Sequence, residues 1–113
     1  MIQIYHNARC GKSRCGLELL EASGKPFEVV KYLEKMPSKK ELNALLKKLG
    51  LKPIDLVRQK ETIWTENFKG KTLSDEDVLD ALIAHPILLE RPIVINGNQA
   101  VIGRPPERIL SII

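Results

Sequence analysis

The residue of this chain best placed to do chemistry is Cys10, the one cysteine of a short polar loop. It follows an apolar segment, Ile2 to Tyr5, that predicts a strand, and it precedes a segment from about Lys12 to Ser23 that predicts a helix. The unpaired N–H groups at a helix N-terminus stabilise a thiolate and also bind oxyanions. The sequence therefore predicts a nucleophilic thiol that acts on an anionic substrate. Three basic residues lie close to it in the sequence: Arg9, Lys12 and Arg14.

The helix alone cannot make this thiol reactive. Lowering a thiol pKa by about two units takes about 2.7 kcal/mol, whereas a helix terminus supplies at most about 2 kcal/mol. At least one cation must contribute, and guanidinium groups also match oxyanions in geometry. Arg58, Arg91 and Arg104 fall at the boundaries of predicted elements, and the last two flank a predicted hairpin. Each of these arginines taken alone is more typical of a surface position, and only the pair that flanks one hairpin makes an oxyanion site equally compatible.

Cys15 and the histidines are weaker candidates. In an ideal helix Cys15 lies about 140° around the axis from Cys10, so it fits a small helical residue better than a resolving cysteine, which is the alternative. His6 is a candidate to orient the loop or to assist proton transfer, whereas His85 fits a helix end. The spacing of two cysteines and two histidines matches no usual zinc pattern, so we expect no metal.

The remaining elements position this loop. Phe27 to Lys31 predicts a second strand, parallel to the first because a helix joins them. Asn96-Gly97 between two apolar segments predicts a hairpin, and a final helix follows Arg104.

The order βαβ, helices, ββα predicts an α/β, thioredoxin-like fold with a mixed four-stranded sheet. We expect one domain, 1–113, with a helical insertion at about 38–85. The predicted insertion begins at a capping box (Ser38 and Glu41), continues through Pro53 to Arg58, and ends with a helix capped by Ser74.

Composition restricts the class of protein. The chain has 113 residues, 43% of them hydrophobic and 28% charged, which is typical of one globular domain. The net charge of +4 comes with spread lysines and only 4% aromatic residues, so we expect no nucleic acid partner. No apolar run approaches the roughly 20 residues of a membrane span, and the N-terminus does not resemble a signal peptide. We therefore expect a cytoplasmic protein with reduced thiols.

Several segments, taken in order, resemble the arsenate reductase family that uses glutathione and glutaredoxin. The resemblance implies a thioredoxin-like fold and arsenate reductase activity. It implies glutathione as co-substrate, glutaredoxin as partner, and no metal or organic cofactor. We also expect a monomer. The matching segments are Ile4-Tyr5-His6-Asn7, Cys10 with Ser13-Arg14, Tyr32-Leu33-Glu34, Arg58-Gln59-Lys60-Glu61, His85-Pro86-Ile87-Leu88, Arg91-Pro92-Ile93-Val94 and Gly103-Arg104-Pro105-Pro106.

The resemblance also implies residue roles. Cys10 matches the nucleophile, His6 and Ser13 match residues near it, and Pro92 matches a proline that follows a cis peptide bond. The arginines that match the oxyanion-binding residues are Arg58, Arg91 and Arg104. The chain departs from the family pattern at Ala8, where the family usually has proline, and at Cys15. Two alternatives stay open: a redox-sensing regulatory protein of the same fold, and a thiol reductase with another substrate.

Overall fold

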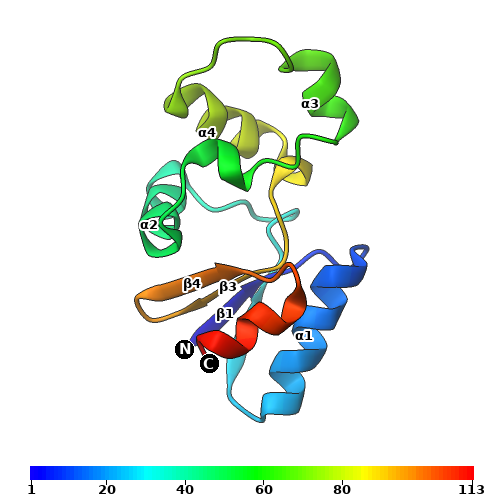
Figure 1. The fold of residues 1–113 in the computed structure, drawn as a ribbon, viewed down its shortest axis with the longest axis vertical. Helices are drawn as coiled ribbons and strands as arrows, with labels where there is room; N and C mark the ends of the chain where they lie inside the picture. Colours follow the sequence, from blue (N-terminus) through cyan, green and yellow to red (C-terminus); the bar gives the residue numbers. More distant parts are fainter. The chain divides into compact units, whose positions relative to one another are not determined.

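The computed structural model describes residues 1–113, which form two compact units (Figure 1). The first unit contains Met1–Lys35 and Arg91–Ile113, and the second contains Met36–Glu90. The elements of the first unit are β1 (Ile2–Tyr5), α1 (Gly11–Ser23), β2 (Phe27–Val30), β3 (Ile93–Asn96), β4 (Gln99–Ile102) and the 3-10 helix η3 (Pro106–Ser111). Those of the second unit are α2 (Lys39–Leu49), the 3-10 helix η1 (Pro53–Leu56), α3 (Thr62–Asn67), α4 (Asp75–Ala84) and the 3-10 helix η2 (Pro86–Leu88).

The first unit is built on a four-stranded sheet with the order β2-β1-β3-β4. Strands β1 and β2 are parallel, with Ile2 opposite Phe27, because α1 carries the chain back to the start of the sheet. β3 runs antiparallel to both β1 and β4. This mixed sheet, in the order βαβ then ββα, confirms the predicted thioredoxin-like fold.

The core of the first unit lies between the sheet and two helices. Ile2, Ile4 and Val94 from the strands pack against Leu20 of α1 and Ile109 of η3. Alternation along a strand puts Ile2 and Ile4 on the same face. Burying each of these side chains contributes about 1.5–3 kcal/mol. Figure 1 shows α1 and η3 side by side on one face of the sheet.

Two glycines let the backbone approach closely at the start of β3. A Cβ at Gly16 of α1 would lie 2.9 Å from both Pro92 Cγ and Ile109 Cδ1. A Cβ at Gly103 would lie 2.8 Å from Pro92 Cγ. Only residues without a side chain fit on either side of Pro92, so α1, the start of β3 and the end of β4 are packed tightly together.

The hairpin differs from the prediction in the place of its turn. Asn96 pairs with Gln99 at the end of the ladder, so Gly97 and Asn98 are the central residues rather than Asn96 and Gly97. Gly97 has φ 61°, and no non-glycine residue has positive φ, as expected of a turn with glycine in its first central position. The side chain of Asn96 is used elsewhere: its Nδ2 donates to the carbonyl of Ile112 at 2.7 Å. The closing helix η3 is a 3-10 helix.

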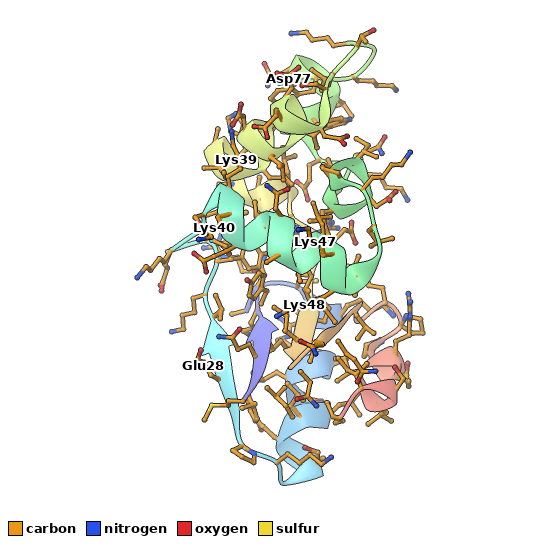
Figure 2. All side chains as sticks on the ribbon, turned by 90° about the vertical axis from the view of Figure 1, so that its left-hand side faces the viewer. Glu28, Lys39, Lys40, Lys47, Lys48 and Asp77 are labelled. Atoms are coloured by element: carbon orange, nitrogen blue, oxygen red, sulfur yellow. The ribbon has the colours of Figure 1, made fainter.

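The second unit is helical. The predicted capping box of Ser38 with Glu41 begins α2. Ser74 caps α4, as predicted, and also forms a capping box with Asp77 that was not predicted. Lys39 Nζ lies 2.8 Å from Glu76 and 2.7 Å from Asp80, which ties α2 to α4. The other lysines of α2 are exposed, as a solvated face requires (Figure 2): Lys40, Lys47 and Lys48.

Helix α3 has no counterpart among the elements predicted from the sequence. Its Trp64 is buried and stacks on Phe68 at 5.2 Å between ring centroids. His85 ends α4, as expected, and packs edge-on against Phe68 at 6.0 Å. The aromatic cluster therefore supports a short helix that has no capping signal of its own. None of the helices combines the length and the apolar character that crossing a bilayer would require.

Candidate active site

Cys10 is the N-cap residue of α1, as predicted. Its backbone is extended (φ −96°, ψ 122°), and its carbonyl accepts a hydrogen bond from Arg14 N–H at 3.0 Å. The Cys10 N–H donates to the Asn7 carbonyl at 3.0 Å, which closes a turn over residues 7–10. The thiol is half-buried. The loop between β1 and α1 therefore presents the sulfur at the first turn of the helix.

A buried hydrogen-bond network holds this loop. Ser13 Oγ accepts the N–H of Asn7 at 2.9 Å and lies 2.7 Å from His6 Nδ1. Asn7 Oδ1 in turn accepts the N–H of Arg9 at 2.9 Å. Asn7 is 3% exposed and Ser13 is fully buried, so the bond between them is protected from water, whereas the bonds to His6 and Arg9 are partly buried. Sequence reasoning missed Asn7, for which the only signal was the preference of asparagine for turns.

Two arginines from the far end of the chain meet the thiol. Arg104 Nη2 donates to Cys10 Sγ at 3.3 Å, and Arg104 Nε donates to the Arg91 carbonyl at 2.8 Å. The side chain of Arg91 is 5% exposed and also hydrogen-bonds to the thiol. The structure thus brings together two of the three predicted arginines. The Arg91–Pro92 peptide is cis, as the resemblance implies, and Arg104–Pro105 is cis as well.

These groups set the charge of the sulfur. Burial alone would raise the pKa of the Cys10 thiol, but the hydrogen bond from the Ser13 backbone, the hydrogen bond from Arg91 and the charge of Arg104 together hold this pKa below its ordinary value. The backbone of Lys12 acts in the same direction. The helix terminus and the cations therefore act together, as the magnitudes require.

His6 is in its neutral form over more of the pH range than an ordinary histidine. Burial lowers its pKa, and so do the positive charges of Arg14 and Lys31, whereas a hydrogen bond with Ser13 has the opposite effect. A neutral imidazole next to Ser13 adds no positive charge to the loop. His6 therefore fits the role of orienting the loop through Ser13.

Two further candidates remain, Cys15 and Arg58. Cys15 is exposed on α1, and both cysteines are free thiols. Arg58 belongs to the second unit, where its guanidinium lies 3.5 Å from Glu61 and 3.9 Å from Glu90. Its role in binding an oxyanion stays a prediction.

The cluster combines a thiolate with fixed positive donors. A tetrahedral oxyanion placed beside the sulfur would find two guanidinium groups and the amide groups of the first turn of α1, which are the donors that stabilise developing negative charge. No group of three or more histidine, cysteine or acidic side chains is arranged to hold a metal ion. The arrangement suits nucleophilic attack by sulfur on an oxyanion.

Known proteins resemble this chain in sequence and in fold. The model of the ArsC family matches residues 5–112. The chain is 46% identical to the uncharacterized protein YfgD of Escherichia coli strain K12, over 99% of this chain and 96% of that protein. It is 42% identical to an arsenate reductase of Neisseria meningitidis serogroup A, over 99% of this chain and 97% of that protein. A solved structure of an arsenate reductase from Vibrio cholerae superposes with a TM-score of 0.93 at 46% identity, covering 99% of this chain and 97% of the other. These matches confirm the resemblance of the sequence motifs, and the chain belongs to the ArsC family.

Proposed function

We propose that the protein is an arsenate reductase, and hence an oxidoreductase, with Cys10 as its nucleophile. The observation that carries the proposal is the 3.3 Å contact between Arg104 Nη2 and Cys10 Sγ, which places a fixed cation at the reacting atom. Membership of the ArsC family supports arsenate as the substrate. Arg91 and Arg104 would bind its oxygen atoms, and Arg58 is a third candidate for that role.

In the first step the Cys10 thiolate attacks arsenic and forms a sulfur–arsenic bond. One arsenate oxygen leaves as water after taking up protons from solvent, and the arsenic stays in the arsenic(V) state. The guanidinium groups of Arg91 and Arg104 neutralise the oxyanion before attack and the charge that develops on its oxygens during attack. His6 and Ser13 keep the loop in place and act as positioning residues.

In the second step glutathione supplies electrons. Its thiolate attacks the Cys10 sulfur, and the electron pair of the sulfur–arsenic bond passes to arsenic, which leaves as arsenite. Cys10 and glutathione are then joined in a mixed disulfide. A glutaredoxin thiol attacks the glutathione sulfur of this disulfide, which restores Cys10 and leaves the glutathionyl group on glutaredoxin. The cycle needs no metal or organic cofactor.

In this scheme an external thiol does the resolving, so Cys15 is dispensable. The exposed position of Cys15 on α1 supports this view. The alternative of a redox-sensing regulatory protein is not favoured, because the comparisons are with arsenate reductases.

The test is arsenite production from arsenate with glutathione and glutaredoxin. We expect turnover by the wild type and by Cys15→Ser, and none by Cys10→Ser. Replacing glutaredoxin with thioredoxin tests which reductant is used. If Cys15→Ser is folded but inactive with glutaredoxin, an internal disulfide replaces the external thiol in the mechanism. Absence of arsenite with every reductant overturns arsenate as the substrate.

A further inference from the structure

A pocket of about 210 Å³ lies in the first unit next to the Cys10 loop. One wall is the loop itself, residues 6–9, and the other is the turn that follows β2. Ala8 and Arg9 are within two residues of Cys10, so their Cα atoms lie within about 7.6 Å of the Cys10 Cα. The lining residues are His6, Asn7, Ala8, Arg9, Lys31, Leu33 and Glu34.

Backbone hydrogen bonds fix both walls of the pocket. His6 N–H donates to the Val30 carbonyl at 3.0 Å, which joins the loop to the end of β2. The N–H groups of Glu34 and Lys35 both donate to the Lys31 carbonyl at 3.0 Å, so Lys31 and Glu34 are held in one tight turn. The pocket therefore exists before any ligand arrives, which reduces the entropy cost of binding.

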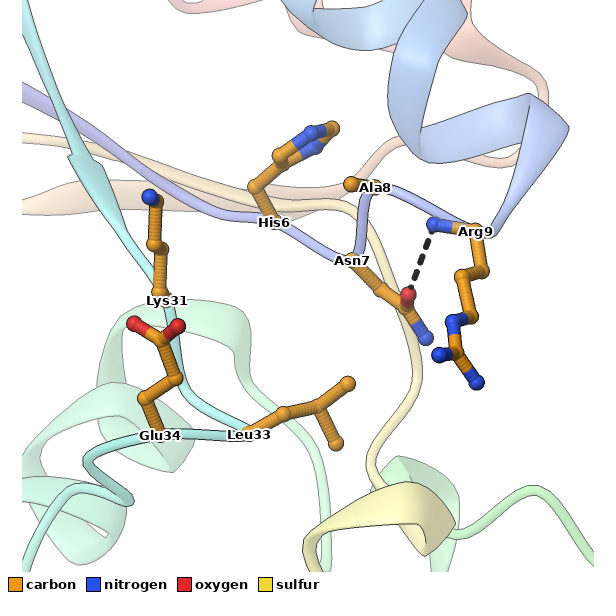
Figure 3. A pocket seen from close by; sticks show the side chains of 7 residues that line it. All are labelled: His6, Asn7, Ala8, Arg9, Lys31, Leu33 and Glu34. Atoms are coloured by element: carbon orange, nitrogen blue, oxygen red, sulfur yellow. Dashed lines mark hydrogen bonds between the residues drawn. The ribbon is translucent and has the colours of Figure 1, made fainter.

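The charges in the pocket form a pattern. Figure 3 shows Lys31 and Glu34 on one side, Asn7 and Arg9 on the other, and the apolar side chain of Leu33 between them. Lys31 and Glu34 share one turn and offer an ammonium and a carboxylate on the same wall. This pair is complementary to a zwitterionic α-amino acid group, which carries a carboxylate and an ammonium on one carbon. Arg9 adds a second cation on the opposite side. Burial is the main cause of the lowered pKa of His6, and the charges of Arg14 and Lys31 lower this pKa further. This effect is consistent with the Lys31 ammonium lying close to the loop.

We infer that this pocket binds the γ-glutamyl end of glutathione, so that its cysteine sulfur reaches Cys10. The carboxylate of the γ-glutamyl group would lie against Lys31, and its ammonium against Glu34. Pockets that enclose drug-sized ligands usually measure about 300–1,000 Å³, so a pocket of about 210 Å³ suits one end of a tripeptide. The inference rests on the proposed use of glutathione as the resolving thiol.

The test uses thiol–disulfide exchange without arsenate, so that it does not depend on arsenate turnover. In the Cys15→Ser protein, the Cys10 thiolate attacks oxidised glutathione, forms a mixed disulfide with one glutathionyl group and releases the other as a thiolate. For each variant, the rate constant for exchange with oxidised glutathione is divided by the rate constant for exchange with the neutral hydroxyethyl disulfide. This division removes any effect of the substitution on the reactivity of Cys10 itself. This ratio measures recognition of glutathione.

We expect Lys31→Met and Glu34→Gln each to lower the ratio by about twofold to fivefold, the usual range for one exposed ion pair, and the double variant to lower it further. Lys35→Met, which removes a charge from the same turn but not from the pocket, is the matched control and should leave the ratio unchanged. The disulfide of cysteinylglycine lacks the γ-glutamyl group. The wild type should therefore react faster with oxidised glutathione than with that disulfide, and the two pocket variants should lose the preference.

The sign of the Glu34→Gln effect is decisive. Oxidised glutathione is an anion, so simple attraction by Arg9 and Lys31 would make removal of a negative charge raise the ratio. An increase, or a ratio that none of the pocket variants changes, overturns the inference. If exchange depends on the pocket but no arsenite is formed in the turnover assay, the glutathione site stands and the proposed substrate is wrong. If arsenite is formed but the exchange ratio is unchanged in the pocket variants, the proposed substrate stands and the glutathione site is wrong.

Discussion

Arg104 and Cys10 are 94 positions apart in the sequence, yet the guanidinium Nη2 of one lies 3.3 Å from the sulfur of the other. The contact exists because β4 ends beside the start of β3, and β3 pairs with β1, which leads directly into the Cys10 loop. Arg104 also donates to the carbonyl of Arg91, so its fork of donors is oriented before any substrate arrives. The proposed oxyanion site therefore depends on both the sheet and the helix terminus.

This geometry predicts the effect of a conservative substitution. Arg104→Lys keeps the charge but loses the planar fork, in which Nε reaches the Arg91 carbonyl and Nη2 reaches the Cys10 sulfur. Losing one charge-assisted hydrogen bond costs about 1.5–3 kcal/mol, so kcat/KM for arsenate should fall by about tenfold to a hundredfold. The matched control is Arg108→Lys, an exposed arginine on η3. Equal activity in the two variants would show that the paired donors of Arg104 have no role in the reaction.

The pH dependence of alkylation follows from the lowered pKa of Cys10. In Cys15→Ser only Cys10 can react, and the rate with iodoacetamide should rise with pH to a midpoint below the ordinary thiol value of about 8.5. In Cys10→Ser only the exposed Cys15 remains, and it should react more slowly at neutral pH. A faster reaction of Cys15 than of Cys10 at neutral pH would show that the nucleophile has been assigned to the wrong residue.

The same pKa shift links stability to pH. Because the folded protein binds the proton of Cys10 less tightly than the unfolded chain, the thiolate stabilises the fold. This stabilisation is fully present above the unfolded pKa of about 8.5 and is lost as the pH falls through the folded value. In urea unfolding from about pH 6 to about pH 9, the stability advantage of Cys15→Ser over the variant that lacks both cysteines should grow with pH. A constant or shrinking advantage contradicts the shift.

Ala8, where the family usually has proline, offers a test of the loop. The Asn7 to Cys10 turn has no positive φ at its central residues, which makes it a type I turn with Ala8 at the position where proline is favoured. We expect Ala8→Pro to raise the free energy of unfolding by about 0.4–1 kcal/mol, because it restricts the unfolded chain. Ser23→Pro, within the last turn of α1, should instead destabilise the protein. A loss of stability in Ala8→Pro would show that the loop has another backbone conformation.

Much of the fold could be predicted because its signals are local. Three such signals depend only on neighbouring residues, and the structure confirms them: the capping box at Ser38, the N-cap at Ser74 and the glycine after α1, Gly24 with φ 71°. The short helix α3 was missed because it depends on packing of Trp64 against Phe68 rather than on a cap. The hairpin turn was placed one residue too early. An Asn-Gly pair favours a turn centred on those two residues, whereas pairing of Asn96 with Gln99 centres the turn on Gly97 and Asn98.

The residues of the proposed site could be named from the sequence, but their geometry could be predicted only in part. A thiol at a helix start can be inferred from the strand, loop and helix that surround Cys10, and two arginines that flank one hairpin point to one end of the sheet. The buried bonds among Asn7, Ser13 and His6 could not be inferred, since they depend on the exact path of the loop backbone. The contact of Arg104 with the Cys10 sulfur could not be inferred either, because it depends on how the sheet brings the two residues together.

The central claim is that the Cys10 sulfur attacks arsenate and that glutathione releases arsenite from it. The direct measurement is a single turnover of Cys15→Ser with arsenate and glutathione and without glutaredoxin, in which arsenite and the mass of the protein are followed together. The account predicts one arsenite per protein molecule, with one glutathionyl group on Cys10 formed at the same rate. Arsenite formed without modification of Cys10, or Cys10 modified equally fast in the absence of arsenate, would contradict it.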